Sequence, residues 1–384
     1  MLDYLPYIVL VLLLFAGSLL EVCGFRKDQV KIVRYFVFTF LLLFVGLRYN
    51  TGADWAAYIE AFNTMSVVGN YPRWEPGFVF ISNLFYYLFG NYYVFQFCAS
   101  LFLLYALLKF YVAHTNYPVL SIAIFFFMFF GSIVMAEVRQ SIALAIVLLG
   151  SKYIFERQSL NFVLTIGIAC LFHISAIFAL PLYLLNKRIS KLSALLLLGF
   201  FQILYFFPEL LAYLLDFIAP ALPGRLGRLA ASYSGSIFGN KANFNTGLYY
   251  IASVIVCLIV LLQTKNNEKT CFYRNALLVA FIITAMSNSM TIIGRFQSYY
   301  MVFGIAACVR IMDEINFKSI ATAATKAVLM VFLFVFFMVP FQALLRSTAI
   351  SELTGRPTNY GCVPYYNVLS YPPEADNRLD WHED

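Results

Sequence analysis

The chain has 384 residues, of which 62% are hydrophobic and 12% are charged. Soluble globular domains are roughly half apolar and about a quarter charged, and a chain of this size cannot bury the excess apolar surface in one aqueous core. The composition therefore excludes a soluble enzyme, a disordered chain and a fibrous protein. We read the net charge of +7 as a signal of membrane topology and expect no nucleic-acid partner.

Long apolar runs separated by short polar stretches recur to about residue 343. A membrane-spanning helix needs about 20 apolar residues, so the pattern predicts an all-α, polytopic membrane protein with about 12 transmembrane helices. The expected spans lie near residues 5–20, 35–47, 93–109, 119–135, 140–155, 160–172, 174–186, 192–208, 246–263, 275–293, 297–312 and 327–343.

The orientation follows from the basic residues after the first span. Arg26, Lys27, Lys31 and Arg34 lie in a short loop, which the positive-inside rule places in the cytoplasm, so that both termini are outside. The segment 76–90 is expected to be re-entrant or interfacial, because a full span there would turn the later basic loops outward. The N-terminus lacks a basic region and a cleavage site, so we expect no cleaved signal peptide.

These expectations divide the chain into two regions. Residues 1–343 form a transmembrane helical domain with outer loops at 48–75 and 208–245, and residues 344–384 form a C-terminal tail on the outer face. There is no internal repeat of the kind that would favour a transporter. The seven cysteines show no CxxC or Cys/His clustering, so the sequence indicates neither a disulfide framework nor a metal site.

The first outer loop opens with Arg48, Thr51, Asp54, Trp55 and Tyr58. Thr51 is expected to cap a helix on which Asp54 and Tyr58 share a face. An arginine suits an anion, a carboxylate suits a sugar hydroxyl, and aromatic rings suit the faces of sugars. The alternative is an interfacial helix with a capping acid and an aromatic belt. We favour that alternative for Trp55, and function for Arg48 and Asp54.

The same loop ends with the run Glu75-Pro76-Gly77-Phe78. An acid followed by proline suits the start of a helix, which explains much of the run without any function. A role for Glu75 as a ligand of a sugar hydroxyl is an equally good interpretation.

Three polar residues, Glu137, Arg139 and Gln140, lie between two strongly apolar runs near the outer membrane boundary. Ionisable groups at this depth are costly and are functional by default, and the arginine fork matches phosphate oxygens. The alternative is a structural Glu137–Arg139 pair. Since these near neighbours do not share a helix face, we favour function for Arg139.

His173 lies at the centre of the apolar stretch 162–185. The chain enters and leaves the membrane there between cytoplasmic charges, so each arm reaches roughly 18–22 Å into a core of about 30 Å. We therefore expect a turn at His173, recessed below the outer surface. Its imidazole would act as a general base or donate a hydrogen bond to a phosphate. The alternative is a structural hydrogen bond to a carbonyl of a neighbouring helix.

Two further cationic positions face outward in this topology. Arg295 follows the span 275–293 and shares a helix face with Tyr299, the alternative being an ordinary loop between antiparallel helices. Arg225 and Arg228 lie in the outer loop 208–245, where the alternative is an amphipathic surface helix with a solvated basic side.

Arg48, Arg139 and Arg295 come from distant segments but are expected to converge on one face, together with a histidine and several carboxylates. Such a set suits a lipid substrate that carries a diphosphate and reacts at the outer surface. No Walker loop, HExxH or GxSxG motif is present, so nothing supports an ATPase, a zinc protease or a serine hydrolase.

At these residues the sequence resembles the EpsG family of bacterial polysaccharide proteins, which is related to the Wzy-type polymerases. The pattern R-Y-x-x-G-x-D-x-x-x-Y is matched over residues 48–58, E-P-G-F over 75–78, R-Q-x-x-A over 139–143 and F-H-x-S-A over 172–176. Each motif is weak alone, but four in order at similar spacing are specific. The resemblance covers roughly residues 30–310, and Thr51 stands where an aliphatic residue is more usual.

The resemblance implies a glycosyltransferase of GT-C-like architecture in the bacterial cytoplasmic (inner) membrane, with its active site toward the periplasmic or extracellular side. The enzyme would transfer a glycan from undecaprenyl pyrophosphate onto the next lipid-linked repeat unit. Its partners would be the lipid-linked oligosaccharide as donor and acceptor, the bilayer, a chain-length-regulating co-polymerase and a flippase.

In this interpretation Arg139 contributes to catalysis by stabilising the departing pyrophosphate without a metal or other cofactor. His173 or Asp54 would handle the acceptor hydroxyl. The candidate substrate-binding residues are Arg48, Arg295, Gln140, Glu137, Glu75, Tyr58, Trp55, Tyr299, Arg225 and Arg228.

Two other functions compete with this one. A flippase for lipid-linked oligosaccharides would need the same cations and rings, but with two related halves and a cavity that reaches both faces. A membrane O-acyltransferase acting on glycan would need a histidine near a cytoplasmic acyl donor, whereas His173 is predicted toward the outer side.

Overall fold

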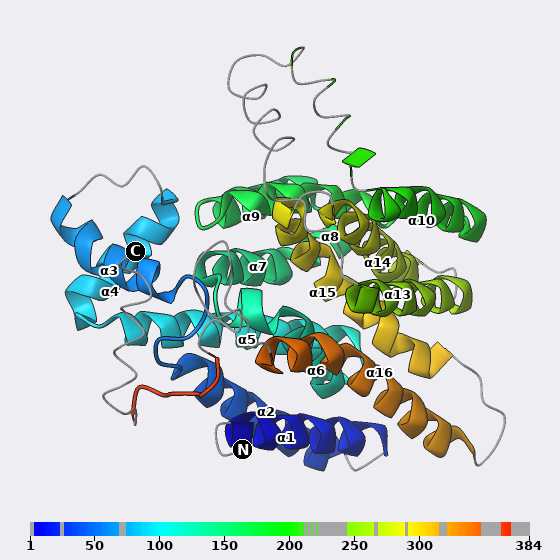
Figure 1. The fold of residues 1–384 in the computed structure, drawn as a ribbon, viewed down its shortest axis with the longest axis horizontal. Coiled ribbons are helices and arrows are strands. Elements are labelled where there is room, and N and C mark those ends of the chain that lie inside the picture. The colour runs from blue at the N-terminus through cyan, green and yellow to red at the C-terminus, as the bar shows by residue number, and fades with distance from the viewer. Residues whose placement is uncertain are drawn as a thin grey trace. The chain divides into compact units, whose positions relative to one another are not determined.

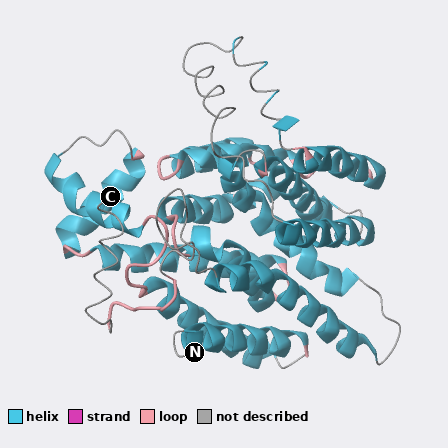
Figure 2. Cartoon of the chain, in the orientation of Figure 1, coloured by secondary structure: helices cyan, strands magenta, loops and turns pink. Residues whose placement is uncertain are grey.

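The computed structural model describes residues 4–23, 27–68, 74–207, 209–210, 213, 217, 220, 244–264, 268–288, 291–314, 321–346 and 362–369. These residues are helical or lie in loops and turns, as Figures 1 and 2 show. The fold is therefore all-helical, as predicted. The helices are α1 (Leu5–Val22), α2 (Lys27–Gly46), α3 (Trp55–Val68), α4 (Pro76–Phe89), α5 (Tyr92–His114), α6 (Pro118–Phe129), the π-helix η2 (Phe130–Val134), α7 (Val138–Gly150), α8 (Lys152–Phe155), α9 (Ser159–Cys170), the 3₁₀-helix η3 (Ile174–Leu184), α10 (Lys191–Phe206), α13 (Phe244–Gln263), α14 (Glu268–Ser287), α15 (Thr291–Glu314) and α16 (Ala321–Arg346).

The expected spans overlap helical segments of the described residues, although the break between the spans 275–293 and 297–312 lies earlier in the chain than expected. Six stretches there are long and apolar enough to cross a membrane, judged by length and composition. They establish a multi-pass membrane protein, while the larger number of about 12 spans and the GT-C-like architecture stay predictions. The six are Leu5–Val22, Asp28–Gly46, Tyr92–His114, Val138–Phe155, Thr270–Ser287 and Ala324–Arg346.

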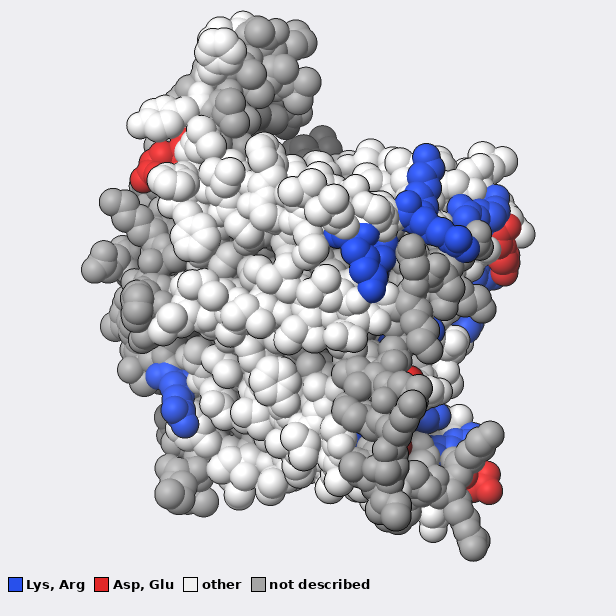
Figure 3. Space-filling view, turned by 90° about the vertical axis from the view of Figure 1, so that its right-hand side faces the viewer, with Lys and Arg blue, Asp and Glu red and all other residues white. Residues whose placement is uncertain are grey.

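The described residues on the face shown in Figure 3 are mostly uncharged. Lysines and arginines occupy only a few places in the view of Figure 3. Large apolar side chains such as Leu160 and Phe200 are 70% and 64% exposed, which would be unfavourable in water. Such a surface is what helices in contact with lipid require.

Two segments of special interest are shorter than the membrane core. Helix α4 has 14 residues, which is about 21 Å against about 30 Å for the core, as a re-entrant or interfacial segment would be. Helix α9 ends at Cys170 and η3 begins at Ile174, so the turn predicted at His173 is confirmed.

The chain forms two compact units: Met1–Ile177 together with Asn316–Asp384, and Phe178–Ile315. This division describes packing. It is different in kind from the predicted boundary between a membrane domain and an outer tail at residues 343 and 344, which stays a prediction.

An aromatic core joins α1, α2, η2 and α16 in the first unit. The ring centroid of Tyr7 lies 5.6 Å from that of Phe44, 6.0 Å from Phe130 and 6.1 Å from Phe341. In a membrane, helices associate through close packing rather than through the hydrophobic effect. These interlocked rings therefore hold η2, which leads into the turn before Arg139.

Part of the C-terminal tail packs against the same unit. The amide of Tyr49 donates to the carbonyl of Tyr366 at 3.0 Å, and the amide of Val368 donates to Leu47 at 2.8 Å. The ring of Tyr365 stacks on Phe44 with centroids 4.5 Å apart. The segment 362–369 thus orders the backbone where the first outer loop begins.

The first outer loop also supports the turn Met135–Glu137 between η2 and α7. Gly52 has a φ of +108°, and a Cβ atom at this residue would lie 2.3 Å from the carbonyl oxygen of Met135. The Nε of Arg48 donates to the same oxygen at 3.2 Å. Both the left-handed backbone and the close approach require glycine at position 52.

In the second unit, α14 and α15 pack along each other, and α10 and α13 pack on α14. The predicted break between the spans 275–293 and 297–312, at Gly294, was wrong. Helix α14 ends at Ser287 and α15 begins at Thr291, so Gly294 lies inside α15. The reason is that an isolated glycine is tolerated inside a helix. Arg295 is consequently a helical residue and does not lie in a loop.

We expect Gly52→Ala to destabilise the folded protein. Strained backbone costs about 1–3 kcal/mol. Each kcal/mol lowers Tm by about 1 °C in a chain of 384 residues, so with the added clash we expect a fall of about 2 °C or more in detergent. Gly167→Ala is the matched control, since a Cβ there meets no atom within 4 Å. Equal Tm values for the two variants would contradict the proposed contact with Met135.

Candidate active site

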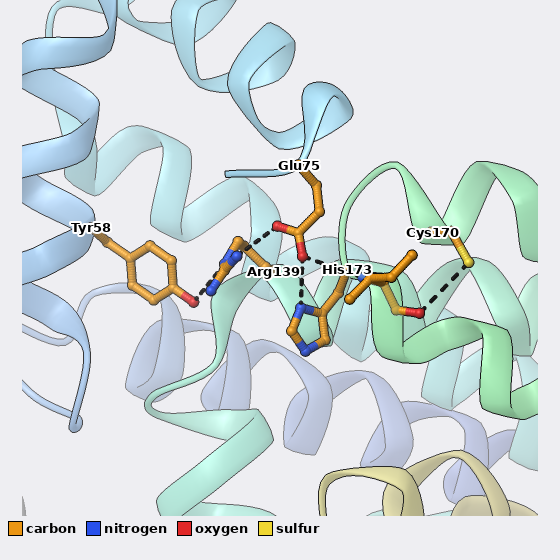
Figure 4. Close-up of polar contacts among 6 residues, drawn as sticks. Tyr58, Glu75, Arg139, Cys170 and His173 are labelled. Atoms are coloured by element: carbon orange, nitrogen blue, oxygen red, sulfur yellow. Dashed lines mark hydrogen bonds and ion pairs between the residues drawn. The ribbon is translucent and has the colours of Figure 1, made fainter. Parts of the chain in front are cut away.

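Four residues from separate predicted motifs meet in the first unit (Figure 4). An Nη atom of Arg139 lies 2.6 Å from Oε2 of Glu75, and Nδ1 of His173 lies 3.2 Å from Oε1 of the same carboxylate. On the other side of Arg139, its Nε donates to the hydroxyl of Tyr58 at 3.5 Å. Together with Trp74, described next, we call these residues the Glu75 cluster.

Arg139 is held by rings as well as by the carboxylate. Its guanidinium carbon lies 4.4 Å from the ring centroid of Trp74 and 5.9 Å from that of Tyr58. A guanidinium at this distance from a ring is attracted by the negative face of the π-system. Trp74 was not among the predicted site residues. The available signal was its place directly before Glu75 in the first outer loop.

Glu75 is positioned by the start of α4. It is the N-cap residue, in extended conformation, and Pro76 follows at the first helical position, as the run of sequence predicts. The amide of Gly77 donates to the carbonyl of Leu171 at 2.8 Å. A Cβ on Gly77 would lie 2.8 Å from that oxygen, so only glycine allows α4 to pack so closely on the turn that carries His173.

The turn after α9 completes the arrangement. The amide of Ile174 donates to Oε1 of Glu75 at 3.3 Å, next to the contact of His173 with the same oxygen. The E-P-G-F and F-H-x-S-A motifs are therefore two sides of one contact. Their residues are far apart in the chain, and hydrogen bonds between them hold the carboxylate against the imidazole.

The environment keeps Glu75 ionised and Tyr58 neutral. Burial raises the pKa of Glu75, but its hydrogen bond with His173 and the charge of Arg139 outweigh burial and lower the pKa from 4.5 to about 2. Burial raises the pKa of Tyr58 to about 12. The side chains of Arg139, Glu75 and His173 are 21%, 15% and 11% exposed, so a ligand can reach them.

This arrangement resembles the part of a catalytic triad that supports a base. An ionised carboxylate that accepts Nδ1–H of an imidazole fixes its orientation and leaves Nε2 to take a proton. Arg139 supplies a positive charge on the other side of the same carboxylate. The cluster can thus combine proton transfer with stabilisation of an anion.

Arg48 has a different surrounding from the one predicted. It is 3% exposed, and besides Met135 its guanidinium donates to the carbonyl of Val45 at 2.7 Å and the hydroxyl of Ser100 at 3.2 Å. These bonds use its donors for backbone support. The expected contact with pyrophosphate stays a prediction that this placement does not favour, and Arg48 acts as a positioning residue for the turn before Arg139.

The start of α3 also differs from expectation. The prediction that Thr51 caps this helix was wrong, because its hydroxyl donates to the carbonyl of Tyr49 at 2.8 Å and the helix begins at Trp55. Asp54 directly precedes the helix, and its carbonyl accepts the amide of Tyr58 at 3.1 Å. Asp54 is partly exposed, and Trp55 is buried.

The remaining predicted residues lie apart from these contacts or in the other unit. Arg139 pairs with Glu75 and not with Glu137, which is the N-cap residue of α7. Gln140 is buried in α7 at 1% exposure. In α15 of the second unit, Arg295 is exposed whereas Tyr299 is fully buried, so the two do not share an environment.

Two expectations are left without a structural result. The predicted convergence of Arg295 with the arginines of the first unit stays a prediction. Arg225 and Arg228 lie outside the described residues. Among the described residues, no group of three or more His, Cys, Asp and Glu side chains could hold a metal ion.

The apolar helices define the class, a multi-pass membrane protein. The chain belongs to the EpsG family, whose family model matches residues 31–365. This is a Wzy-type polysaccharide polymerase family, and membership indicates a membrane polysaccharide polymerase, as the four motifs predict. Comparison with curated proteins and with solved structures gave no match.

We expect Gly77→Ala to reduce polymerisation without unfolding the protein. The added methyl group would push the start of α4 away from Leu171, and a displacement of about 1 Å in a catalytic group costs up to about 100-fold in rate. A fall of at least about tenfold is therefore expected in a polymerisation assay. Gly199→Ala, where a Cβ meets nothing within 4 Å, should keep wild-type activity; a similar loss in both variants would contradict the role of this contact.

The pKa of Glu75 predicts how its contribution to stability depends on pH. Because the pKa in the folded protein (about 2) is below the ordinary value of 4.5, the ionised group stabilises the fold fully above about pH 4.5 and progressively less as the pH falls toward about 2. The Tm difference between wild type and Glu75→Gln should thus be constant from pH 8 to 5 and smaller at pH 3. Glu60→Gln on the exposed side of α3 should show no such trend.

Proposed function

We propose that the protein is a glycosyltransferase that polymerises repeat units carried on undecaprenyl pyrophosphate. The growing glycan would be transferred from its lipid carrier to the next lipid-linked unit, at the outer face of the bacterial cytoplasmic membrane. The observation that carries this proposal is the Glu75 cluster, in which one carboxylate contacts both an arginine and a histidine. Membership of the EpsG family supports the class of reaction.

In the proposed reaction, a hydroxyl oxygen of the acceptor attacks the anomeric carbon of the donor glycan. The bond from that carbon to the pyrophosphate oxygen breaks, and its electron pair leaves with undecaprenyl pyrophosphate. The hydroxyl proton passes to Nε2 of His173, which Glu75 orients through Nδ1. Positioned bases of this kind contribute about 10²–10⁴-fold to a rate.

Arg139 has the properties needed by the leaving group. A guanidinium presents its donors as a fork that fits phosphate oxygens, and its fixed charge stabilises the negative charge that develops on pyrophosphate. Its Nη1 and Nε contact Glu75 and Tyr58, while the side chain is 21% exposed. The cation is thus held on one side and open on another, and the reaction proposed needs no metal.

The polar loops and the positive-inside pattern support a topology of about 12 spans with the cluster toward the periplasmic or extracellular side. A co-polymerase and a flippase would act before or beside this enzyme, since chain length and delivery of the lipid-linked unit are separate tasks. Asp54, which directly precedes α3, is the alternative base.

The test uses purified protein and the host's undecaprenyl-pyrophosphate-linked repeat unit, without nucleotide sugar or ATP. Wild-type protein should give a ladder of longer glycans on a gel, also in the presence of a chelator. Arg139→Ala and His173→Ala should each lower the rate by at least about 100-fold. The matched controls are Arg188→Ala and His114→Ala. Arg188 is an exposed arginine of the second unit, and His114 packs against the rings of Phe110 and Phe155.

Other outcomes would redirect the assignment. A ladder that survives His173→Ala but not Asp54→Asn would make Asp54 the base. No ladder from folded wild-type protein with the correct substrate would overturn the polymerase proposal. The flippase alternative would then be tested by translocation of the same substrate in vesicles.

A further inference from the structure

A cavity of about 340 Å³ lies beside α3 in the first unit. Its volume is within the range of roughly 300–1,000 Å³ that is usual for small-molecule sites. Four aromatic residues line it, Tyr49, Trp55, Tyr92 and Tyr93. All four come from the 48–55 segment or from the first turn of α5.

Amide side chains supply most of the other polar groups. Asn50, Asn63 and Asn91 also line the cavity, and among the described residues that line it none is charged. An amide group both donates and accepts hydrogen bonds. Rings with amides and no charge are the chemistry that suits a neutral sugar, whose C–H faces pack on aromatic rings and whose hydroxyl groups need both donors and acceptors.

The walls of the cavity are ordered by their own contacts. The hydroxyl of Tyr93 donates to Oδ1 of Asn50 at 2.7 Å, and the rings of Tyr49 and Tyr93 stack with centroids 5.1 Å apart. Asn50 has a φ of +45°, a left-handed conformation that asparagine tolerates better than most residues. A site with pre-ordered walls loses less free energy when it binds.

Helix α3 connects the cavity to the Glu75 cluster. Trp55, Ile59 and Asn63 line the cavity at intervals of four residues, which places them on one face of the helix. Tyr58 lies on the adjacent face and contacts Arg139. Since residues 55 and 58 are separated by about 4.5 Å along the axis, the two sites begin within one turn of each other.

We propose that this cavity binds a neutral sugar residue of the glycan, next to the residues that act on the pyrophosphate. The proposal rests on the function proposed above and deepens it, because it assigns the selection of sugar to a site without charge. The cavity would hold the chain in register while the Glu75 cluster acts at the bond that is broken.

The test measures binding without catalysis. The probe is the repeat-unit oligosaccharide released from its lipid carrier, titrated into detergent-solubilised wild-type protein by calorimetry. Asn63→Ala is the main variant, because Asn63 is exposed on α3 and its loss should leave the fold intact. Loss of one hydrogen-bonding side chain should raise Kd about three- to tenfold, and in the ladder assay it should raise KM with kcat little changed.

Two controls separate this site from the rest of the chain. Asn161→Ala, an exposed asparagine of α9, should keep the wild-type Kd. Inorganic pyrophosphate, as a second probe, should bind more weakly to Arg139→Ala but equally to Asn63→Ala and wild type. Trp55→Phe keeps a ring but reduces its area, and it should weaken binding of the oligosaccharide in the same way as Asn63→Ala.

The outcomes distinguish the two proposals. Wild-type protein that makes a ladder but binds the oligosaccharide with the same Kd as Asn63→Ala and Trp55→Phe would overturn the sugar site and leave the polymerase standing. Oligosaccharide binding that depends on Asn63, without any ladder, would support the sugar site and overturn the polymerase. A change in pyrophosphate binding by Asn63→Ala would also count against a neutral-sugar site.

Discussion

The candidate site depends on the packing of the start of α4 against the turn between α9 and η3. Gly77 brings its amide to the carbonyl of Leu171 at 2.8 Å, a distance that no side chain with a Cβ would allow. That contact carries Glu75 to His173. Because the carboxylate is held at both oxygens, its pKa stays near 2, and it can orient the imidazole and hold the guanidinium at the same time.

Arg48 and Arg139, both in the first unit, show how burial separates structural from chemical roles. Arg48 is 3% exposed and donates to two backbone carbonyls. Its guanidinium therefore stabilises the turn before α7. Arg139 lies after that turn, in the first turn of α7. Its guanidinium packs on the ring of Trp74, and its side chain is partly exposed. A partly open cation can meet a phosphate without first breaking a buried network, whereas Arg48 cannot.

Helix α3 links recognition and chemistry in this account. One face of this helix lines a cavity whose described residues include rings and amides but no charged side chain, and the adjacent face places Tyr58 against Arg139. A polymerase must hold a chain of sugars while it acts on a charged leaving group. In this proposal the two tasks fall on two faces of one short helix, so the sugar site and the charged site lie within one turn of each other.

The sequence alone determined the class of the fold and the family to which the chain belongs. The apolar runs and the polar residues that interrupt them are local properties, so the helices, the turn at His173 and the helix start at Pro76 could be read from the chain. The residue types that suit an anion, a hydroxyl and a sugar face could be read in the same way, and they led to the EpsG family.

Only the tertiary structure decided which of these residues act together. Sequence spacing cannot show that the partner of Arg139 is Glu75 and not its near neighbour Glu137. It also cannot show that Arg48 is buried against Met135, or that Trp74 lies against the guanidinium of Arg139. Each of these depends on a contact between segments at least 60 residues apart in the chain. Such contacts are set by close packing at Gly52 and Gly77, where the absence of a side chain carries no pattern that sequence periodicity can reveal.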